Sequence, residues 1–232
     1  MFRFKQFTIH QNRAAMKVCT DSCVLGAYAE LGTGGRLLDI GTGTGLLALM
    51  AAQRNPTARI DAVEVDPAAF GQAVENVNDS PFSDQVRVIQ SRIQTFSSEP
   101  YDRILCNPPF YTNHLRSPDQ SVNRALHNDE LPFEELIASV VRLLKPEAQF
   151  WVLLPPFEMQ RLAVIAEKAG LHPYQQLEVR HNDLKPVFRT VAGFGFNRFS
   201  PPKSEQLSIF NPDGKLYTES FRQLLQPFYL NF

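Results

Sequence analysis

Hydrophobic positions along the chain form two alternating kinds of segment. Short, continuous apolar runs are typical of strands in a parallel sheet, and longer segments with apolar residues at helical spacing are typical of the helices between such strands. The predicted strands are 36–40, 60–65, 86–89, 101–106 and 149–154, and the predicted helices begin near 46, 67, 133 and 158. This alternation predicts an α/β fold.

The last third of the chain has a different pattern. The segments 177–180, 187–196 and 206–210 read as strands without helices between them, and a final helix is expected near 218–225. Strand–helix alternation followed by consecutive strands predicts a doubly wound, mostly parallel sheet with an antiparallel edge. We find no internal repeat and expect residues 1–232 to form a single domain.

Composition narrows the class of protein further. Of the 232 residues, 44% are hydrophobic and the formal net charge is −1, which argues against a protein coated in positive charge but permits a local basic groove. The first residues lack the apolar core of a signal peptide, and no window approaches the length of a membrane span. Three cysteines are too few for a disulfide framework, and Cys19 and Cys23 lack further ligands that would complete a metal site. We expect a cytoplasmic protein without a bound metal.

A glycine-rich turn, Gly41-Thr42-Gly43-Thr44-Gly45, joins the first of these strands to its helix. Such a turn places a ligand at the helix N-terminus. The pattern G-x-G-x-G differs from the G-x-G-x-x-G of dinucleotide sites, and it suits S-adenosylmethionine, which has no pyrophosphate. Asp39 can meet the ammonium group of the cofactor, and Glu64 at the end of the second strand can bridge its ribose hydroxyls. A plain turn or another nucleotide site remains an alternative.

The tetrapeptide Asn107-Pro108-Pro109-Phe110 follows the fourth of these strands, at the same edge of the sheet. An exocyclic amine of a base is a poor nucleophile because its lone pair is delocalised into the ring. The Asn107 side-chain oxygen and the Pro108 carbonyl can accept both N–H bonds and favour a pyramidal nitrogen. Proline at 108 and 109 stiffens the turn, and Phe110 offers a ring for stacking a base.

The structural alternative for the tetrapeptide is a stiff loop closed by an aromatic side chain. Its combination with the glycine turn and the acidic end of the second strand, in this order, favours catalysis over that alternative. The combination predicts transfer of a methyl group from S-adenosylmethionine to a planar amino group.

Several motifs resemble those of a known family of methyltransferases. The chain is similar to the bacterial tRNA adenine-N6 methyltransferases that act beside the anticodon of a valine tRNA. The matching segments are Phe4-Lys5-Gln6-Phe7, Met16-Lys17-Val18 with Thr20-Asp21, 38–43, Ala62-Val63-Glu64, 107–110 and Phe228-Tyr229. The resemblance implies a Rossmann-like class I methyltransferase fold with a seven-stranded sheet, S-adenosylmethionine as cofactor and tRNA as partner.

The resemblance also implies roles for particular residues. Lys17, Thr20 and Asp21 would border the cofactor near its methionine end, and the N-terminal segment 1–24 would contribute to the cofactor and substrate sites. The chain departs from the family at four positions. Glycine is usual where this chain has Cys19 and Ser22, an acid where it has Arg92, and arginine where it has Leu126. With Arg92 in place of the acid, the backbone of Ile93 would meet the adenine of the cofactor.

Basic side chains are candidates for phosphate contacts, although exposure to solvent alone is the default explanation for each. The four main candidates are Lys5, Arg13, Arg116 and Arg124, with Arg180, Lys185 and Arg189 beside them. Other functions remain open at this point: guanine-N2 methylation of ribosomal RNA, glutamine-N5 methylation of a protein, and RNA binding without catalysis. The sequence does not specify the oligomeric state, and a monomer is the expectation.

Overall fold

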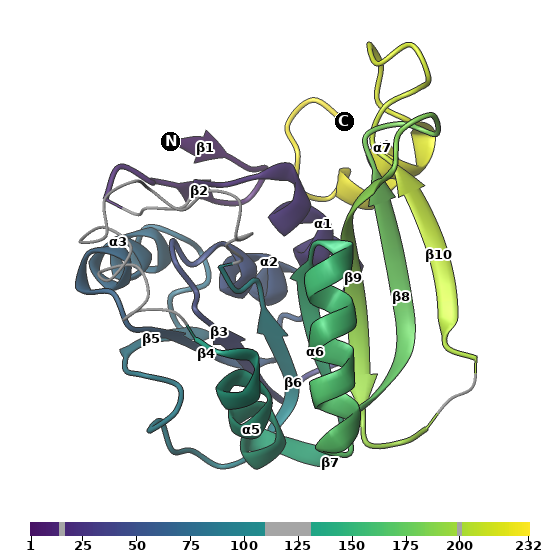
Figure 1. Ribbon diagram of the computed structural model, residues 1–232. Helices are drawn as coiled ribbons and strands as arrows, with labels where there is room; N and C mark the ends of the chain where they lie inside the picture. Colours follow the sequence, from purple (N-terminus) through teal and green to yellow (C-terminus); the bar gives the residue numbers. More distant parts are fainter. Residues whose placement is uncertain (14–16, 110–130, 199–200) are drawn as a thin grey trace, which may run out of the picture.

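The computed structural model describes residues 1–13, 17–109, 131–198 and 201–232. Its main element is a sheet of eight strands in the order β10-β8-β9-β7-β6-β3-β4-β5 (Figure 1). The strands are β3 (Arg36–Ile40), β4 (Arg59–Glu64), β5 (Val86–Gln90), β6 (Tyr101–Cys106), β7 (Leu144–Leu154), β8 (His172–Arg180), β9 (Val187–Gly195) and β10 (Lys203–Ser208). Strand β9 runs antiparallel to both β7 and β8, so the expected doubly wound sheet with an antiparallel edge is confirmed.

The sheet has eight strands in the described part of the chain, where seven were expected. The number seven comes from the family resemblance, whereas the sequence pattern itself contains eight strand segments; the last of them corresponds to β10, which pairs in parallel with β8 at the edge of the sheet. This strand lies earlier than the predicted segment 206–210, and Phe210 instead makes an isolated bridge with Tyr217. Strand β7 is also longer than predicted, because it begins at Leu144 directly after a helix.

Helices cover both faces of the sheet. The helices are α1 (Thr20–Tyr28), α2 (Leu46–Arg54), α3 (Pro67–Asn78), α5 (Phe133–Leu143), α6 (Pro156–Lys168) and α7 (Glu219–Leu225). One hydrophobic core contains residues of α1, α2, α3 and α7, and a second core on the opposite face contains residues of α5 and α6. Trp151 is fully buried in β7, as its place in an apolar strand predicts. None of the helices in the described ranges is long and apolar enough to span a membrane.

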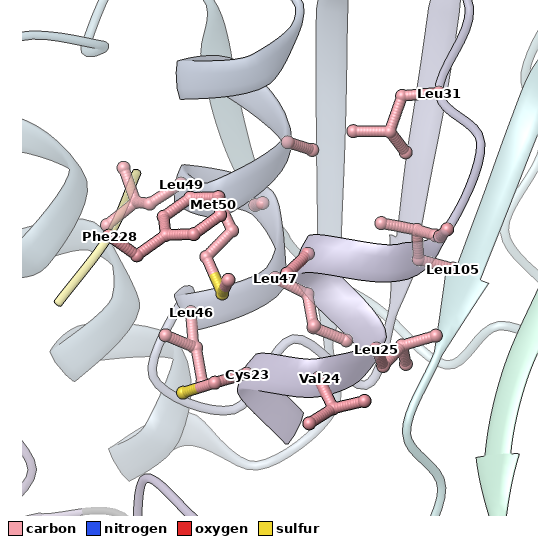
Figure 2. Close-up of a cluster of buried hydrophobic side chains, with 14 of the residues drawn as sticks. Cys23, Val24, Leu25, Leu31, Leu46, Leu47, Leu49, Met50, Leu105 and Phe228 are labelled. Carbon is pink, nitrogen blue, oxygen red and sulfur yellow. The ribbon is translucent and has the colours of Figure 1, made fainter. Parts of the chain in front are cut away.

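Helix α1 packs directly on α2 (Figure 2). Figure 2 shows Met50 of α2 beside Phe228, in the same buried cluster as Cys23 and Val24 of α1. A Cβ atom at Gly26 would lie 2.6 Å from the Met50 sulfur, so the close approach of the two helices depends on glycine at this position. The contact brings the first turn of α1 to the glycine turn that precedes α2.

The two ends of the chain are joined to each other. The short strands β1 (Phe2–Arg3) and β2 (Thr8–Ile9) form a hairpin, and the Lys5 amide donates to the Phe228 carbonyl at 2.8 Å. Phe4 bridges to Tyr229, and aromatic rings from both ends pack together. We call residues 2–9 and 226–232 together the terminal clasp. Figure 1 shows both ends on the same side of the molecule.

Asn76 in α3 connects the N-terminal segment to the glycine turn. Its Nδ2 donates to the carbonyls of His10 (2.8 Å) and Thr44 (2.9 Å), and its Oδ1 accepts from the His10 amide at 2.8 Å. The side chain is fully buried, so these three hydrogen bonds have no solvent substitute.

Replacing Asn76 by alanine is expected to lower the free energy of unfolding by roughly 2–4 kcal/mol, because buried backbone groups lose their partners. The measurement is the urea midpoint of the purified variant. Asn78→Ala, at an exposed position of the same helix, is the matched control and should stay within about 0.5 kcal/mol of the parent. Equal midpoints for the two variants would contradict the connecting role of Asn76.

Candidate methyl-transfer site

The glycine turn and the tetrapeptide lie side by side at the carboxyl edge of the sheet. Strands β3 and β6 are parallel neighbours, and Ile40 pairs with Cys106 in their register. The next residues, Gly41 and Asn107, therefore leave adjacent strands at the same level. From β3 the chain runs to β4 and β5 on one side and later to β6 on the other, which makes this a topological switch point. Ligands of open α/β sheets bind in the crevice at such a point.

The turn 41–45 needs glycine for two different reasons. Gly41, Gly43 and Gly45 all have positive φ angles, of 68°, 58° and 84°. A Cβ atom at Gly41 or Gly43 would meet nothing within 4 Å, so both residues leave open space for a ligand. A Cβ atom at Gly45 would lie 3.7 Å from Ala73 and Val77, so this residue faces α3 and not the open space.

A cavity of about 460 Å³ opens between α1 and the glycine turn. It is lined by Lys17, Val18, Cys19, Ser22, Gly41, Thr42, Gly43, Thr44, Leu46, Leu47 and Asn107. A second cavity of about 360 Å³ is lined by Ile40, Gly41, Val63, Val65, Ser91, Arg92, Ile93, Gln94 and Leu131. Both cavities border Gly41, and both are lined by a mixture of polar and apolar side chains. The two volumes include space that is open to solvent, and the enclosed part of each cavity is about 60 Å³.

Asp39 lies behind the glycine turn and holds it in place. Its Oδ2 accepts hydrogen bonds from the Thr42 hydroxyl (2.5 Å) and the Ala48 amide (3.1 Å), whereas its buried Oδ1 has no hydrogen-bond partner in the described part of the chain. Burial raises the pKa of this carboxyl to about 7, against the opposing effect of the two hydrogen bonds. A carboxylate with an unpartnered oxygen and a raised pKa favours a nearby cation.

Glu64, at the end of β4, is engaged with the backbone. One carboxylate oxygen accepts from the Gly43 amide at 2.8 Å, and the other accepts from the amides of Val65 and Asp66, both at 2.9 Å. Asp66 caps α3 by accepting a hydrogen bond from the Ala69 amide. The Glu64 carboxylate thus lies against the glycine turn and the start of α3, and it is not itself among the residues that line either cavity.

Asn107 borders the first cavity from the other side. Its Nδ2 donates to the Ser22 hydroxyl at 2.8 Å, and its Oδ1 is buried without a hydrogen-bond partner among the described residues. Pro108 is buried and Pro109 is exposed. Phe110, the fourth residue of the predicted catalytic set, lies outside the described residues. An unpartnered amide oxygen at the cavity wall is suited to accept an N–H bond from a substrate.

The N-terminal segment contributes side chains that sequence reasoning assigned only in part. Lys17 lines the first cavity as expected, together with Cys19 and Ser22, which stood out only as departures from the family pattern. Thr20 is exposed at the first residue of α1 and does not line the cavity. Asp21 is buried and forms an ion pair with Arg189 of β9 at 2.7 Å. That pair fixes α1 to the antiparallel edge of the sheet and was not foreseen.

The candidate phosphate contacts are dispersed in the described structure. Lys5 Nζ donates to the carbonyls of Gln226 and Phe232 and so belongs to the terminal clasp. Arg13 forms an exposed ion pair with Glu75 at 2.6 Å. Arg116, Arg124 and Leu126 lie outside the described residues. The described ranges hold no cluster of three or more His, Cys, Asp or Glu side chains that could bind a metal ion.

The residues of this region fit S-adenosylmethionine. Asp39, with its unpartnered oxygen, and Glu64 both lie directly against the glycine turn, although neither lines a cavity, so their roles toward an ammonium group and ribose hydroxyls stay predictions. Ile40, Val63 and Ile93 provide apolar surface for an adenine ring. The open space at Gly41 and Gly43 lets a ligand approach the backbone closely.

Comparison with known proteins identifies the family. The model of the methyltransferase small domain matches residues 21–162. A Dyadobacter fermentans protein named tRNA1(Val) (adenine(37)-N6)-methyltransferase is 48% identical and covers 100% of this chain and 98% of its own. A Pedobacter heparinus protein of the same name is 38% identical, with coverage of 100% and 98%.

A solved structure supports the fold. The crystal structure of a predicted O-methyltransferase from Agrobacterium tumefaciens aligns with a TM-score of 0.67 at 15% identity, and it covers 89% of this chain and 96% of its own. The similarity in sequence extends over the whole length of the curated relatives, including the tetrapeptide region. This chain therefore belongs to the family of tRNA1(Val) (adenine(37)-N6)-methyltransferases.

Proposed function

We propose that this protein transfers a methyl group from S-adenosylmethionine to the N6 amine of adenine 37 in a valine tRNA, the adenine next to the anticodon. Family membership over the full chain supports this substrate. The observation that carries the chemistry is the buried, unpartnered Asn107 oxygen at the wall of a cavity bordered by the glycine turn.

The residues of the tetrapeptide prepare the amine for reaction. The Asn107 oxygen and the Pro108 carbonyl would each accept one N–H bond, which draws the nitrogen out of the ring plane and aims its lone pair into the cavity. The buried Pro108 has a fixed φ angle, so its carbonyl is aligned before substrate arrives. We assign base stacking to Pro109 and Phe110 on chemical grounds. Bound S-adenosylmethionine supplies an electrophilic methyl group on a positively charged sulfur.

The remaining residues hold the cofactor in our proposal. Asp39 and Lys17 would lie near the methionine portion, with Thr20 and Asp21 as more distant supports. Glu64 would accept from the ribose, and Ile93 would lie beside the adenine. Gly41, Thr42 and Gly43 would form the backbone cradle, and Gly45 would act through its packing on α3. Arg92 lines the adenine-side cavity in place of an acid, so the Ile93 backbone would provide the polar contact there.

We infer that the substrate is tRNA and that residues 1–232 act as one domain and as a monomer. We also propose that the protein acts in the cytoplasm, where tRNA is modified before use. Lys5 and Arg13 would then contribute to RNA binding only if phosphate replaced their present partners. Arg116 and Arg124 remain candidates for phosphate contacts, as the sequence predicts.

The test is a methylation reaction with purified protein, labelled S-adenosylmethionine and an unmodified valine tRNA transcript, followed by nucleoside mass spectrometry. We expect N6-methyladenosine, formed at a rate at least about 100-fold above that of a transcript carrying guanine at position 37. N2-methylguanosine in ribosomal RNA, or methylated glutamine in a release factor, would assign the site to another amino group. Failure of calorimetry to detect S-adenosylmethionine binding would favour RNA binding without catalysis.

A further inference from the structure

Ser22 contacts Asn107 across the cofactor cavity, although 85 positions separate the two residues. Ser22 lies in the first turn of α1 and is only 6% exposed. Its hydroxyl oxygen accepts from Asn107 Nδ2 at 2.8 Å. Asn107 has no other side-chain hydrogen bond among the described residues, so this contact alone fixes the rotation of its amide plane.

The orientation of an asparagine amide decides whether it can serve an amine substrate. With the oxygen toward the cavity, Asn107 presents an acceptor to the N–H bonds of the substrate. With the amide rotated by half a turn, it would present an NH₂ group, and two donors would face each other. The two orientations have nearly the same shape, so only a hydrogen-bond partner on the other side of the amide distinguishes them.

A serine hydroxyl alone does not distinguish them well, because it can donate as readily as it accepts. Cys19 sets the direction of the hydrogen bond between Asn107 and Ser22. Its Sγ lies 2.8 Å from Ser22 Oγ, and by this contact alone either atom could be the donor. The Cys19 thiol also has a hydrogen bond to the Asp21 carboxylate, which can only accept, so the sulfur is left to accept from the Ser22 hydroxyl and the Ser22 oxygen to accept from Asn107. Burial and the nearby Asp21 carboxylate raise the pKa of the Cys19 thiol, so the sulfur stays neutral. The hydrogen bonds then run in one direction, from Asn107 to Ser22 to Cys19.

We propose that Ser22 and Cys19 are positioning residues that hold the Asn107 amide with its oxygen toward the substrate amine. The inference rests on the proposed function, because it concerns the same acceptor. Ser22 and Cys19 also line the same cavity as Asn107, so their hydrogen bonds lie at the wall of the proposed methyl-transfer site.

The test compares Ser22→Ala with Ser22→Thr and with Ser139→Ala, a buried serine of α5 on the opposite face of the sheet. Single-turnover rates are measured with both substrates saturating, and KM values for tRNA and S-adenosylmethionine are measured separately. Ser22→Ala should slow the chemical step by about three- to tenfold, which is the loss of one hydrogen bond, with both KM values within a factor of about two. Ser22→Thr should restore at least half of the rate, and Ser139→Ala should leave it unchanged.

Cys19→Ala tests whether Cys19 sets the direction of the hydrogen bonds from Asn107 to Ser22. This variant also provides an independent test if threonine does not fit at position 22. It should slow the step by about two- to threefold, because the Ser22 hydroxyl can then also donate to the amide oxygen. Cys19→Ser, which keeps an acceptor, should recover the rate. An unchanged rate in Ser22→Ala, or a loss confined to KM, would refute the positioning role in an enzyme that remains active. A parent protein that forms no N6-methyladenosine would instead refute the proposed function.

Discussion

Replacing Asn107 by alanine is expected to lower the rate of methyl transfer to tRNA by at least about 100-fold. The variant loses the side-chain oxygen that accepts an N–H bond of the amine, and preorganised polar contacts of this kind are typically worth factors of about 100 to 1,000 in rate. The rate is measured in single turnover with saturating S-adenosylmethionine. Cofactor affinity, measured by calorimetry, should stay within a factor of about three, because the glycine turn and Asp39 are untouched.

Asn107→Asp is the informative companion variant, because it keeps the shape of the side chain and an oxygen that accepts hydrogen bonds. It loses the NH₂ group that Ser22 holds and places a negative charge beside a cofactor with a positive sulfur. We expect a rate between those of the parent and the alanine variant. Full activity in Asn107→Ala would rule out an amide acceptor at this position.

Asp39→Asn is expected to weaken cofactor binding and to stabilise the cofactor-free protein at the same time. The loss of a charge-assisted contact to an ammonium group should raise the Kd of S-adenosylhomocysteine, which carries the same amino-acid tail, about tenfold or more. Above neutral pH the parent must keep a buried carboxylate with one unpartnered oxygen ionised, and the amide removes that cost.

The direction of the pH dependence follows from the raised pKa. The Asp39 carboxyl has a pKa of about 7 in the fold, against 3.8 for an ordinary aspartate. The contribution of the protonated Asp39 carboxyl to the stability of the fold is therefore complete below pH 3.8, and it is lost progressively as the pH rises through about 7. At pH 8, removing the buried charge should stabilise Asp39→Asn relative to the parent by roughly 2–4 kcal/mol. The unpartnered amide of the variant offsets part of this gain, so we expect its melting temperature to rise by a few degrees.

Two measurements check these expectations. Melting temperatures of the cofactor-free proteins between pH 5 and 8 should diverge as the pH rises, whereas Asp79→Asn, at the exposed end of α3, should follow the parent. The affinity of the parent for S-adenosylhomocysteine should fall about eightfold from pH 7.5 to 6, because the ionised fraction of Asp39 falls by that factor. An affinity independent of pH would show that the Asp39 charge does not contribute to binding.

The sequence was sufficient to predict that the glycine turn and the tetrapeptide lie at the same edge of the sheet, because this placement follows from local patterns and from a general rule of parallel sheets. A glycine turn after one strand and Asn107 after another must meet if the two strands are neighbours, and Gly41 and Asn107 do lie at adjacent strand ends. Helix boundaries were also well defined where an apolar stripe alternates with polar residues, as in α5, which was expected to begin near residue 133.

The features that sequence reasoning missed have two physical causes. Helix α1 has no amphipathic pattern to detect, because residues 21–27 are all buried by the surrounding elements. The contacts of Ser22 with Asn107 and of Asp21 with Arg189 join residues that lie far apart in the chain, so no local pattern encodes them. Strand β10 was displaced in the prediction, since it is a largely polar edge strand with little apolar alternation.

The terminal clasp has a consequence for how the protein is made. Residues 2–9 leave the ribosome well before Phe228 and Tyr229, with which they form backbone hydrogen bonds. Helix α1, which carries Ser22 and packs against α7, lies between this early segment and its late partners. The sheet can therefore assemble during synthesis while the wall of the cofactor cavity formed by residues 17–22 stays incomplete. We therefore expect the cofactor cavity to be complete only after residues 226–232 have been synthesised and have packed against the N-terminal segment.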